Sequence, residues 1–429
     1  MLLEGPSNER QIPGNTGGMA MRARKLKLAA AIAALTLLAT PALAAPTCEN
    51  TQNFEQWLAA FKKDAIAQGV SPQVVAAASP SLTVDDAVLK RDRAQHVFSL
   101  SFIKFSDRLI SQNRMENGAK HLKEHAALFA KIERDYGVPP QVLTAFWGLE
   151  SDFSANFGKF NILRSLTTLA YDCRRADFFR GQLIDALRLV QRGDQRVEDM
   201  QGDWAGEFGG MQVTASDYLK NGVDYDGDGR RDIIRSTPDM LATAANFLKN
   251  LGWQRGQPWL QEVRVPAQMK WEEADLSITH PRSQWVAWGV TAANGKLPTD
   301  NLEASLLLPM GRFGPAFLAY PNFKAFLGWN SAMVYSTTVA YFATRLSGAP
   351  PVYRGSPDIV TLDVNQMSEL QRLLQRHGYE VGEIDGKFGT LTRVAVKQAQ
   401  LKAGLPADSY PTLELIERLR SQTNGASLH

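Results

Sequence analysis

A single glutamate, Glu150, lies among apolar residues in a segment that has the spacing of a helix. The segment begins at Pro140, and proline is favoured in the first turn of a helix. Leu143, Phe146 and Trp147 precede Glu150 by seven, four and three residues. This spacing puts the carboxyl group on the same helical face as three large apolar side chains.

Two physical effects would raise the pKa of Glu150 in that position. Apolar surroundings disfavour the charged carboxylate, and so does the negative end of the helix macrodipole near the predicted C-terminus. A carboxyl group with a raised pKa can donate a proton near neutral pH, as a general acid must. The same spacing also fits a glutamate at the margin of an apolar face, whose carboxylate reaches water or an arginine. Periodicity alone leaves both interpretations open.

The composition is that of a globular protein with more than one domain. The chain has 429 residues, of which 44% are hydrophobic and 21% charged, and this length suits two or three domains. The net charge of +3 is too small for a broad nucleic-acid surface, so we expect no nucleic-acid partner.

Residues 1–44 have the pattern of a leader followed by a secretory signal peptide. Basic residues between 22 and 27 precede an apolar run over 28–38, which is too short for a comfortable membrane span. An A-x-A cleavage site follows at 42–44. We therefore expect export to the periplasm and no transmembrane helix in the mature chain. The residues before Cys48 lack the pattern that lipid attachment requires, so a lipoprotein is not expected.

The chain contains two cysteines, Cys48 and Cys173. An even pair in an exported protein favours a disulfide, which would tie the start of the mature chain to its central domain. The alternative is a pair of buried free thiols.

The periodicity predicts a mainly α fold with a few short strands and a small C-terminal domain. The predicted catalytic domain covers residues 45–347, a Pro- and Gly-rich linker covers 348–360, and a helical unit covers 361–422. Strand-like alternation is confined to 263–288. Helices are predicted over 54–68, 92–114, 116–136, 178–192, 237–251 and 335–346, and in the C-terminal unit over 367–377, 392–403 and 411–419.

Several blocks occur in an order and spacing that resemble the lytic murein transglycosylases of the B type. The resemblance covers roughly residues 50 to 347. The blocks include Gly148–Ser151, Arg174–Arg175, Gly202–Gln212, Leu307–Phe317 and Trp329–Asn330.

This resemblance implies a lysozyme-like helical domain in which Glu150 is the catalytic acid. Members cleave the β-1,4 bond between N-acetylmuramic acid and N-acetylglucosamine and form a 1,6-anhydro sugar. One carboxyl group suffices because the attacking group is the C6 hydroxyl of the sugar itself. Matching positions imply a set of substrate-binding residues: Ser151, Arg174, Arg175, Phe178, Gln212, Trp329, Asn330 and Tyr335.

Those residues also have simpler interpretations. The two arginines would suit sugar or peptide carboxylates, but they could equally pair with an acidic residue on the surface. Trp329 could be ordinary core packing. Asp152 is a second acid near Glu150, but a helix would turn it to another face. The chain departs from the family at Asp203 and at Val213–Ser216, which puts its sub-site preferences in doubt.

The segment from Asp224 resembles the start of an EF-hand loop. Asp224, Asp226 and Asp228 supply oxygens at positions 1, 3 and 5, but Arg235 stands where the last carboxylate belongs. The alternatives are a weak Ca²⁺ site and a turn held by its own hydrogen bonds. We expect that the protein requires no cofactor.

Residues 361–422 resemble the three-helix peptidoglycan-binding module of cell-wall enzymes. The Asp385–Gly389 loop is the most specific part, while Ala399 stands where an aromatic residue usually precedes Gln400. We expect a monomer that binds peptidoglycan glycan strands, with other cell-wall enzymes as further partners. Hydrolytic muramidase activity and a non-catalytic wall-binding scaffold are the alternative functions.

Overall fold

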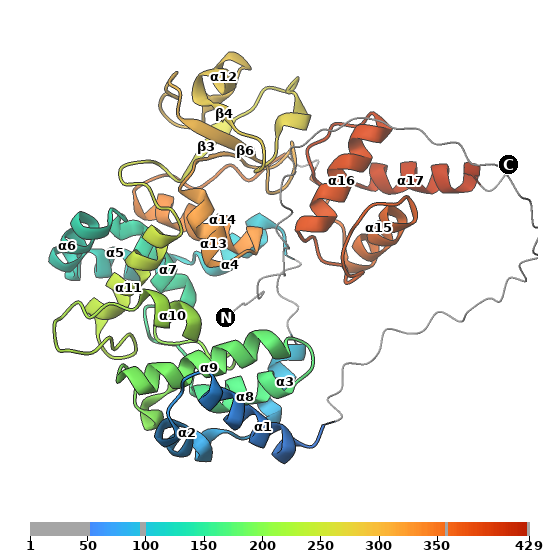
Figure 1. Cartoon of the computed structure of the whole chain (residues 1–429). Coiled ribbons are helices and arrows are strands. Elements are labelled where there is room, and N and C mark those ends of the chain that lie inside the picture. The colour runs from blue at the N-terminus through green and yellow to red at the C-terminus, as the bar shows by residue number, and fades with distance from the viewer. Residues whose placement is uncertain (1–51, 95–99, 357–358, 427–429) are drawn as a thin grey trace, which may run out of the picture.

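The computed structural model describes residues 52–94, 100–356 and 359–426 (Figure 1). The predicted signal peptide and Cys48 lie outside the described residues, so export and the Cys48–Cys173 bridge stay predictions. Within the described residues, no helix is both long enough and apolar enough to cross a membrane.

The last of the first seven helices, α7, carries Glu150 in its final turn and is buried on all sides. Every residue of α7 from Val142 to Ser151 is buried, so the helix has no solvent face and the apolar stripe extends around it. α7 packs against α14, α5, α6 and α11, and these neighbours position its last turn. These first helices are α1 (Phe54–Ala67), α2 (Pro72–Ala78), α3 (Asp86–Arg93), α4 (Phe102–Leu109), α5 (Gln112–Glu124), α6 (Ala126–Tyr136) and α7 (Pro140–Ser151).

A second set of helices completes the main helical body. α8 and α9 lie antiparallel below α7 in the view of Figure 1, and a two-stranded ribbon of β1 (Phe160–Asn161) and β2 (Gln201–Gly202) leads into the loop beside Glu150. This set comprises α8 (Ile162–Tyr171), α9 (Ala176–Arg192), α10 (Ala215–Asn221), α11 (Thr237–Asn250), α13 (Phe323–Trp329) and α14 (Met333–Leu346).

Two predicted helices are wrong, because within each predicted range one helix ends and another begins. The segment 92–114 is not one helix, since α3 ends at Arg93, α4 begins at Phe102 and α5 begins after Ser111. The Ser111 hydroxyl accepts a hydrogen bond from the Arg114 N–H at 3.2 Å, which favours a new N-terminus there. The segment 116–136 is broken at His125, which ends α5 and begins α6.

Short strands form an antiparallel sheet above α13 and α14 (Figure 1), but only two of the five reach into the segment 263–288 where the sequence predicts them. Its order is β4-β6-β7-β3-β5, and Trp285 fills the core beneath α12 while its indole N–H donates to the Ala304 carbonyl at 2.9 Å. The elements are β3 (Leu260–Arg264), β4 (His280–Pro281), α12 (Arg282–Ala287), β5 (Thr291–Ala292), β6 (Glu303–Leu307) and β7 (Ala316–Ala319).

The C-terminal unit consists of three helices around its own small core. The helices are α15 (Val364–Arg376), α16 (Thr390–Ala403) and α17 (Leu413–Ala426). Gln371 holds the predicted loop, because its side-chain oxygen accepts from the Gly386 N–H at 2.9 Å and its amide donates to the Lys387 carbonyl at 3.1 Å. Ala399 lies in the core, so the position that usually holds an aromatic residue is filled here by a small side chain.

The C-terminal unit docks on the main body through a buried ion pair. The guanidinium of Arg312 lies 3.2 Å from a carboxylate oxygen of Asp408, and the Arg312 N–H donates to the same oxygen at 3.0 Å. The Arg393 guanidinium donates to the Leu308 carbonyl at 2.9 Å. Gly311, at φ +70°, allows this approach, because an added Cβ would lie 2.7 Å from that of Tyr410.

We expect the Arg312→Met substitution to weaken this docking by about 3 kcal/mol, because it leaves the buried Asp408 carboxylate without its cation. Calorimetric unfolding should show a lower midpoint or a separate transition for the C-terminal unit. Arg354→Ala is the matched control, since Arg354 and its partner Asp107 are both mostly exposed and their ion pair contributes at most about 1 kcal/mol. Equal midpoints for both variants would show that the buried pair does not hold the units together.

Candidate active site

The carboxyl group of Glu150 is buried at the junction of three helices. Only 5% of the residue is exposed. One carboxyl oxygen accepts hydrogen bonds from the Trp329 indole N–H at 3.1 Å and from the Tyr335 hydroxyl, while the other has no hydrogen-bond partner among the described residues. Burial raises the pKa of Glu150 to about 8, although the hydrogen bonds from Tyr335 and Trp329 act in the opposite direction. A proton is therefore available at this site near neutral pH.

The chain reverses abruptly after Glu150, and this turn fixes the end of α7. Asp152, Phe153 and Ser154 have φ values of 51°, 59° and 69°, a conformation that side-chain-bearing residues seldom adopt. Three successive residues of this kind store backbone strain, which is typical of functional sites. The Asp152 carboxylate turns away from Glu150 and pairs with Arg114 at 2.5 Å.

Ser151 holds the turn in place from beneath. Its buried hydroxyl donates to the Gly210 carbonyl at 2.6 Å and accepts from the Ser154 N–H at 2.9 Å. Because its hydroxyl is used within the protein, the geometry favours a positioning role for Ser151 over direct contact with substrate.

A small pocket opens beside Glu150 and brings several predicted residues together. Gln212, Trp329 and Asn330 line it together with Glu150. Gln212 has a φ of 49°, and its amide donates to the Gly209 and Phe157 carbonyls at 2.7 and 3.2 Å. The full lining is Glu150, Glu207, Gln212, Val213, Thr214, Asp217, Phe247, Trp329 and Asn330.

The wall opposite α7 is set by the end of α13 and the start of α14. Trp329 packs its ring against Phe146 and Phe247, with centroids 4.4 and 5.0 Å away. The side-chain oxygen of Asn330 accepts from the Ala332 N–H at 2.9 Å, which fixes the turn between the two helices. Trp329 therefore both packs in the core and binds Glu150.

The sequence-based assignment missed two buried acids in the loop opposite Glu150. Asp203 and Glu207 are 6% and 2% exposed, and within the part of the chain that the structure describes each has one carboxyl oxygen without a hydrogen-bond partner. Burial raises the pKa of Asp203 to about 6. Burial, and then the charges of Asp203 and Glu150, raise the pKa of Glu207 well above its usual value. The signal in the sequence was the position of Glu207 between Gly206 and Phe208, where a solvent-exposed face is not expected.

The predicted arginines do not line this pocket. Both Arg174 and Arg175 bind the carboxylate of Asp92 on α3, which is itself buried. The Nε of Arg175 has no hydrogen-bond partner in residues 52–94, 100–356 and 359–426, and burial lowers the pKa of this guanidinium. Phe178 lies one turn further on and packs edge-on against Phe179. Their role in substrate binding stays a prediction.

The carboxylates that lie close together at the acidic loop after α10 differ from the predicted set of metal ligands. Asp224 and Asp226 approach Asp239 of α11, whereas Asp228 lies outside this cluster. The Asp224 carboxylate accepts from the Gly227 and Gly229 N–H groups at 2.8 and 2.9 Å. Arg235, at the last loop position, pairs with Asp199. These contacts suit a loop held by its own hydrogen bonds, and they do not support an EF-hand.

Comparisons with known proteins show which family the two parts of the chain match. The family model described as "Transglycosylase SLT domain" matches residues 53–344, and the one described as "Putative peptidoglycan binding domain" matches residues 363–419. Membrane-bound lytic murein transglycosylase B of Escherichia coli (strain K12) is 26% identical over 242 residues, which cover 56% of this chain and 65% of that relative.

Solved structures of lytic transglycosylases are also similar to this chain. SltB3 from Pseudomonas aeruginosa, in complex with NAG-anhNAM-pentapeptide, is 39% identical with a TM-score of 0.79 and covers 86% of this chain and 100% of that chain. The Escherichia coli lytic transglycosylase Slt35 in complex with calcium is 23% identical, with a TM-score of 0.58 over 68% of this chain and 92% of that chain, and shares the fold.

Proposed function

Because this chain belongs to the transglycosylase SLT domain family, we propose that it cleaves the β-1,4 bond between N-acetylmuramic acid and N-acetylglucosamine in peptidoglycan, leaving 1,6-anhydro ends. The observation that carries this proposal is the buried Glu150, whose pKa of about 8 keeps it protonated at the end of a pocket.

Glu150 acts first as an acid and then as a base. Its proton passes to the glycosidic oxygen as the bond to the sugar breaks. The carboxylate that results is stabilised by the hydrogen bonds from Tyr335 and Trp329. It then takes the proton of the C6 hydroxyl as that oxygen attacks the anomeric carbon, which closes the anhydro ring and restores the acid.

The side chains that line the small pocket, of about 30 Å³, and the C-terminal unit both suit contact with a glycan strand. Trp329 and Phe247 offer ring surfaces to apolar sugar faces, while Gln212 and Asn330 offer polar groups. The C-terminal unit would hold the enzyme on the cell wall, and export to the periplasm would bring it there. The SltB3 relative was solved with an anhydro-muropeptide, which supports the same product for this chain.

Digestion of purified sacculi tests the proposal. The soluble products should carry 1,6-anhydromuramic acid ends, which are lighter by one water than hydrolysed ends. Products that carry only ordinary reducing ends would contradict it. Sacculi that bind the protein and are not solubilised would favour a scaffold.

One observation favours a second candidate, hydrolysis by a muramidase mechanism. Glu207 supplies the second carboxyl group that hydrolysis needs, and it lines the same pocket as Glu150. Its strongly raised pKa argues against a water-activating base, because a base must be ionised at the working pH.

We expect Glu207→Gln to retain anhydro product formation within about tenfold of the unsubstituted rate. A complete loss of lysis in that variant, with the fold intact, would favour hydrolysis.

Tyr335→Phe tests the hydrogen bond that supports the carboxylate form of Glu150. Losing the hydroxyl should raise the pKa of Glu150 further, by about one unit or more, and slow turnover about tenfold. The alkaline limb of the rate against pH should move upward accordingly. Tyr341→Phe is the matched control on the same helix, because the Tyr341 hydroxyl accepts from the Val352 N–H instead. An unchanged pH profile in Tyr335→Phe would show that this bond does not govern Glu150.

A further inference from the structure

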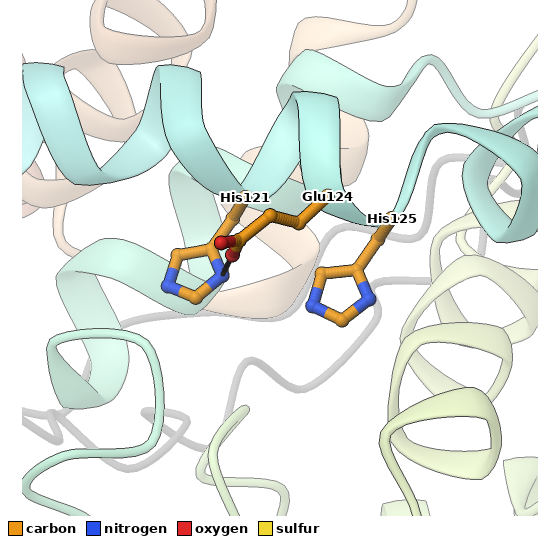
Figure 2. Close-up of side chains that lie close together, drawn as sticks. All are labelled: His121, Glu124 and His125. Atoms are coloured by element: carbon orange, nitrogen blue, oxygen red, sulfur yellow. Dashed lines mark ion pairs between the residues drawn. The ribbon is translucent and has the colours of Figure 1, made fainter.

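A cluster of two histidines and one glutamate lies at the corner between α5 and α6, apart from the pocket at Glu150. Figure 2 shows His121, Glu124 and His125 directed to the same side of the end of α5. Each offers one ligand atom, and these three atoms all lie within 4.8 Å of one another. The spacing His-x-x-Glu-His brings all three to one side because residues three and four apart share a helical face.

The separations are close to those of a tetrahedral metal site. The Nδ1 atom of His121 lies 3.6 Å from a carboxylate oxygen of Glu124, which is too long for a hydrogen bond. Two ligands at about 2.0–2.1 Å from a tetrahedral Zn²⁺ lie about 3.4 Å apart. Closing the wider gap to His125 requires a shift of little more than an ångström by flexible side chains.

The imidazole of His121 has a ring nitrogen that is available to bind a metal. Its Nδ1 atom is buried and has no hydrogen-bond partner in the described structure. Burial lowers the pKa of the imidazole, with Lys120 and His125 adding to the effect and Glu124 opposing it. A neutral imidazole with a free ring nitrogen is the form that binds a metal.

Aromatic side chains pack against the two rings, while the side that carries Glu124 is open to solvent. His121 packs against Trp147 and Phe153 with ring centroids 4.7 and 4.8 Å away, and His125 packs against Trp147 and Phe129 at 5.7 and 6.3 Å. Glu124 is about half exposed and also approaches Lys120 at 3.7 Å, so it can exchange that weak pair for a metal. The open side leaves room for water as a fourth ligand.

We propose that His121, Glu124 and His125 form a binding site for Zn²⁺ or a similar divalent transition metal. Two imidazoles and one carboxylate are the ligands such ions prefer, whereas Ca²⁺ prefers oxygen alone. A bound ion joins the last turn of α5 to His125, the residue between α5 and α6. Trp147 on α7 contacts both histidines, so the bound ion also stabilises the position of α7, the helix that carries Glu150.

Calorimetric titration of the untagged, chelator-treated protein with ZnCl₂ tests this site. We expect one equivalent to bind near neutral pH and the unfolding midpoint to rise with metal concentration. His121→Phe, which keeps the ring packing, and Glu124→Gln should each weaken binding at least about tenfold. Lys123→Ala, an exposed neighbour on the same turn, should bind as the unsubstituted protein does.

Two further arms separate this site from the acidic loop. Asp226→Asn should leave the affinity for Zn²⁺ unchanged, and Ca²⁺ should not compete for it. Cobalt(II) absorption bands typical of tetrahedral nitrogen and oxygen ligands should appear in the unsubstituted protein and be lost in His121→Phe. Equal Zn²⁺ affinity in the unsubstituted protein and His121→Phe would overturn the proposal, as would no binding at about 100 μM Zn²⁺, far above the Kd expected for such a site.

Discussion

Replacing Glu150 with glutamine is expected to slow the solubilisation of sacculi by about 10³-fold or more. The amide keeps the shape of the side chain and can still accept hydrogen bonds from Trp329 and Tyr335, but it has no proton to give. Both halves of the reaction depend on this group, so the loss applies to the acid step and the base step. Release of soluble muropeptides per unit time is the measurement.

Asp152→Asn is the matched control for this substitution. Asp152 is the neighbouring acid, its carboxylate pairs with Arg114, and asparagine tolerates the positive φ of 51° at this position. We expect this variant to keep activity within about tenfold of the unsubstituted protein, since breaking a partly exposed ion pair costs about 1 kcal/mol or less. Binding to sacculi should be unchanged in both variants. Comparable activity in Glu150→Gln and the unsubstituted protein would remove Glu150 from the mechanism.

Glu150→Gln is also expected to stabilise the protein at alkaline pH, relative to the unsubstituted protein. The carboxyl group of Glu150 has a pKa of about 8 in the folded chain and 4.5 without the fold. Below pH 4.5 both states hold the proton, so Glu150 makes no pH-dependent difference there. Between pH 4.5 and 8 the unfolded state releases its proton while the folded state keeps it, so the free energy of unfolding falls as pH rises. The shift corresponds to about 5 kcal/mol at full extent.

Urea unfolding of both proteins at pH 5 and pH 8 measures this effect. The difference between the two proteins reports Glu150 together with its electrostatic coupling to Asp203 and Glu207, whose own raised pKa values add to the slope of each protein alone. We expect Glu150→Gln to gain several kcal/mol relative to the unsubstituted protein on going from pH 5 to pH 8. A difference that does not change with pH would contradict the raised pKa.

Local periodicity predicted much of the helical body but not its breaks. α9, α11 and α14 were placed within two residues at each end, since each carries a continuous apolar face. The restart at Ser111 and the corner at His125 were missed because single polar residues can cap a helix or continue it. The histidine cluster forms at this corner.

The site was predictable where its residues belong to recognisable blocks and not where it depends on contacts distant in sequence. Glu150, Gln212 and Trp329 line one pocket and the Tyr335 hydroxyl donates to Glu150, while their roles toward substrate stay predictions. The partner of Arg174 and Arg175 is Asp92, more than 80 positions earlier, and periodicity carries no information about such a pairing. The docking of Arg312 on Asp408 is equally distant in sequence.

Digestion of sacculi in ¹⁸O-labelled water tests the central claim most directly, because it asks which oxygen attacks the sugar. If Glu150 activates the C6 hydroxyl, the new ends are 1,6-anhydromuramic acid and contain no ¹⁸O. If a water molecule attacks instead, each new reducing end carries one ¹⁸O atom and has the mass of a hydrolysed product. Labelled reducing ends as the main product would contradict the proposed mechanism.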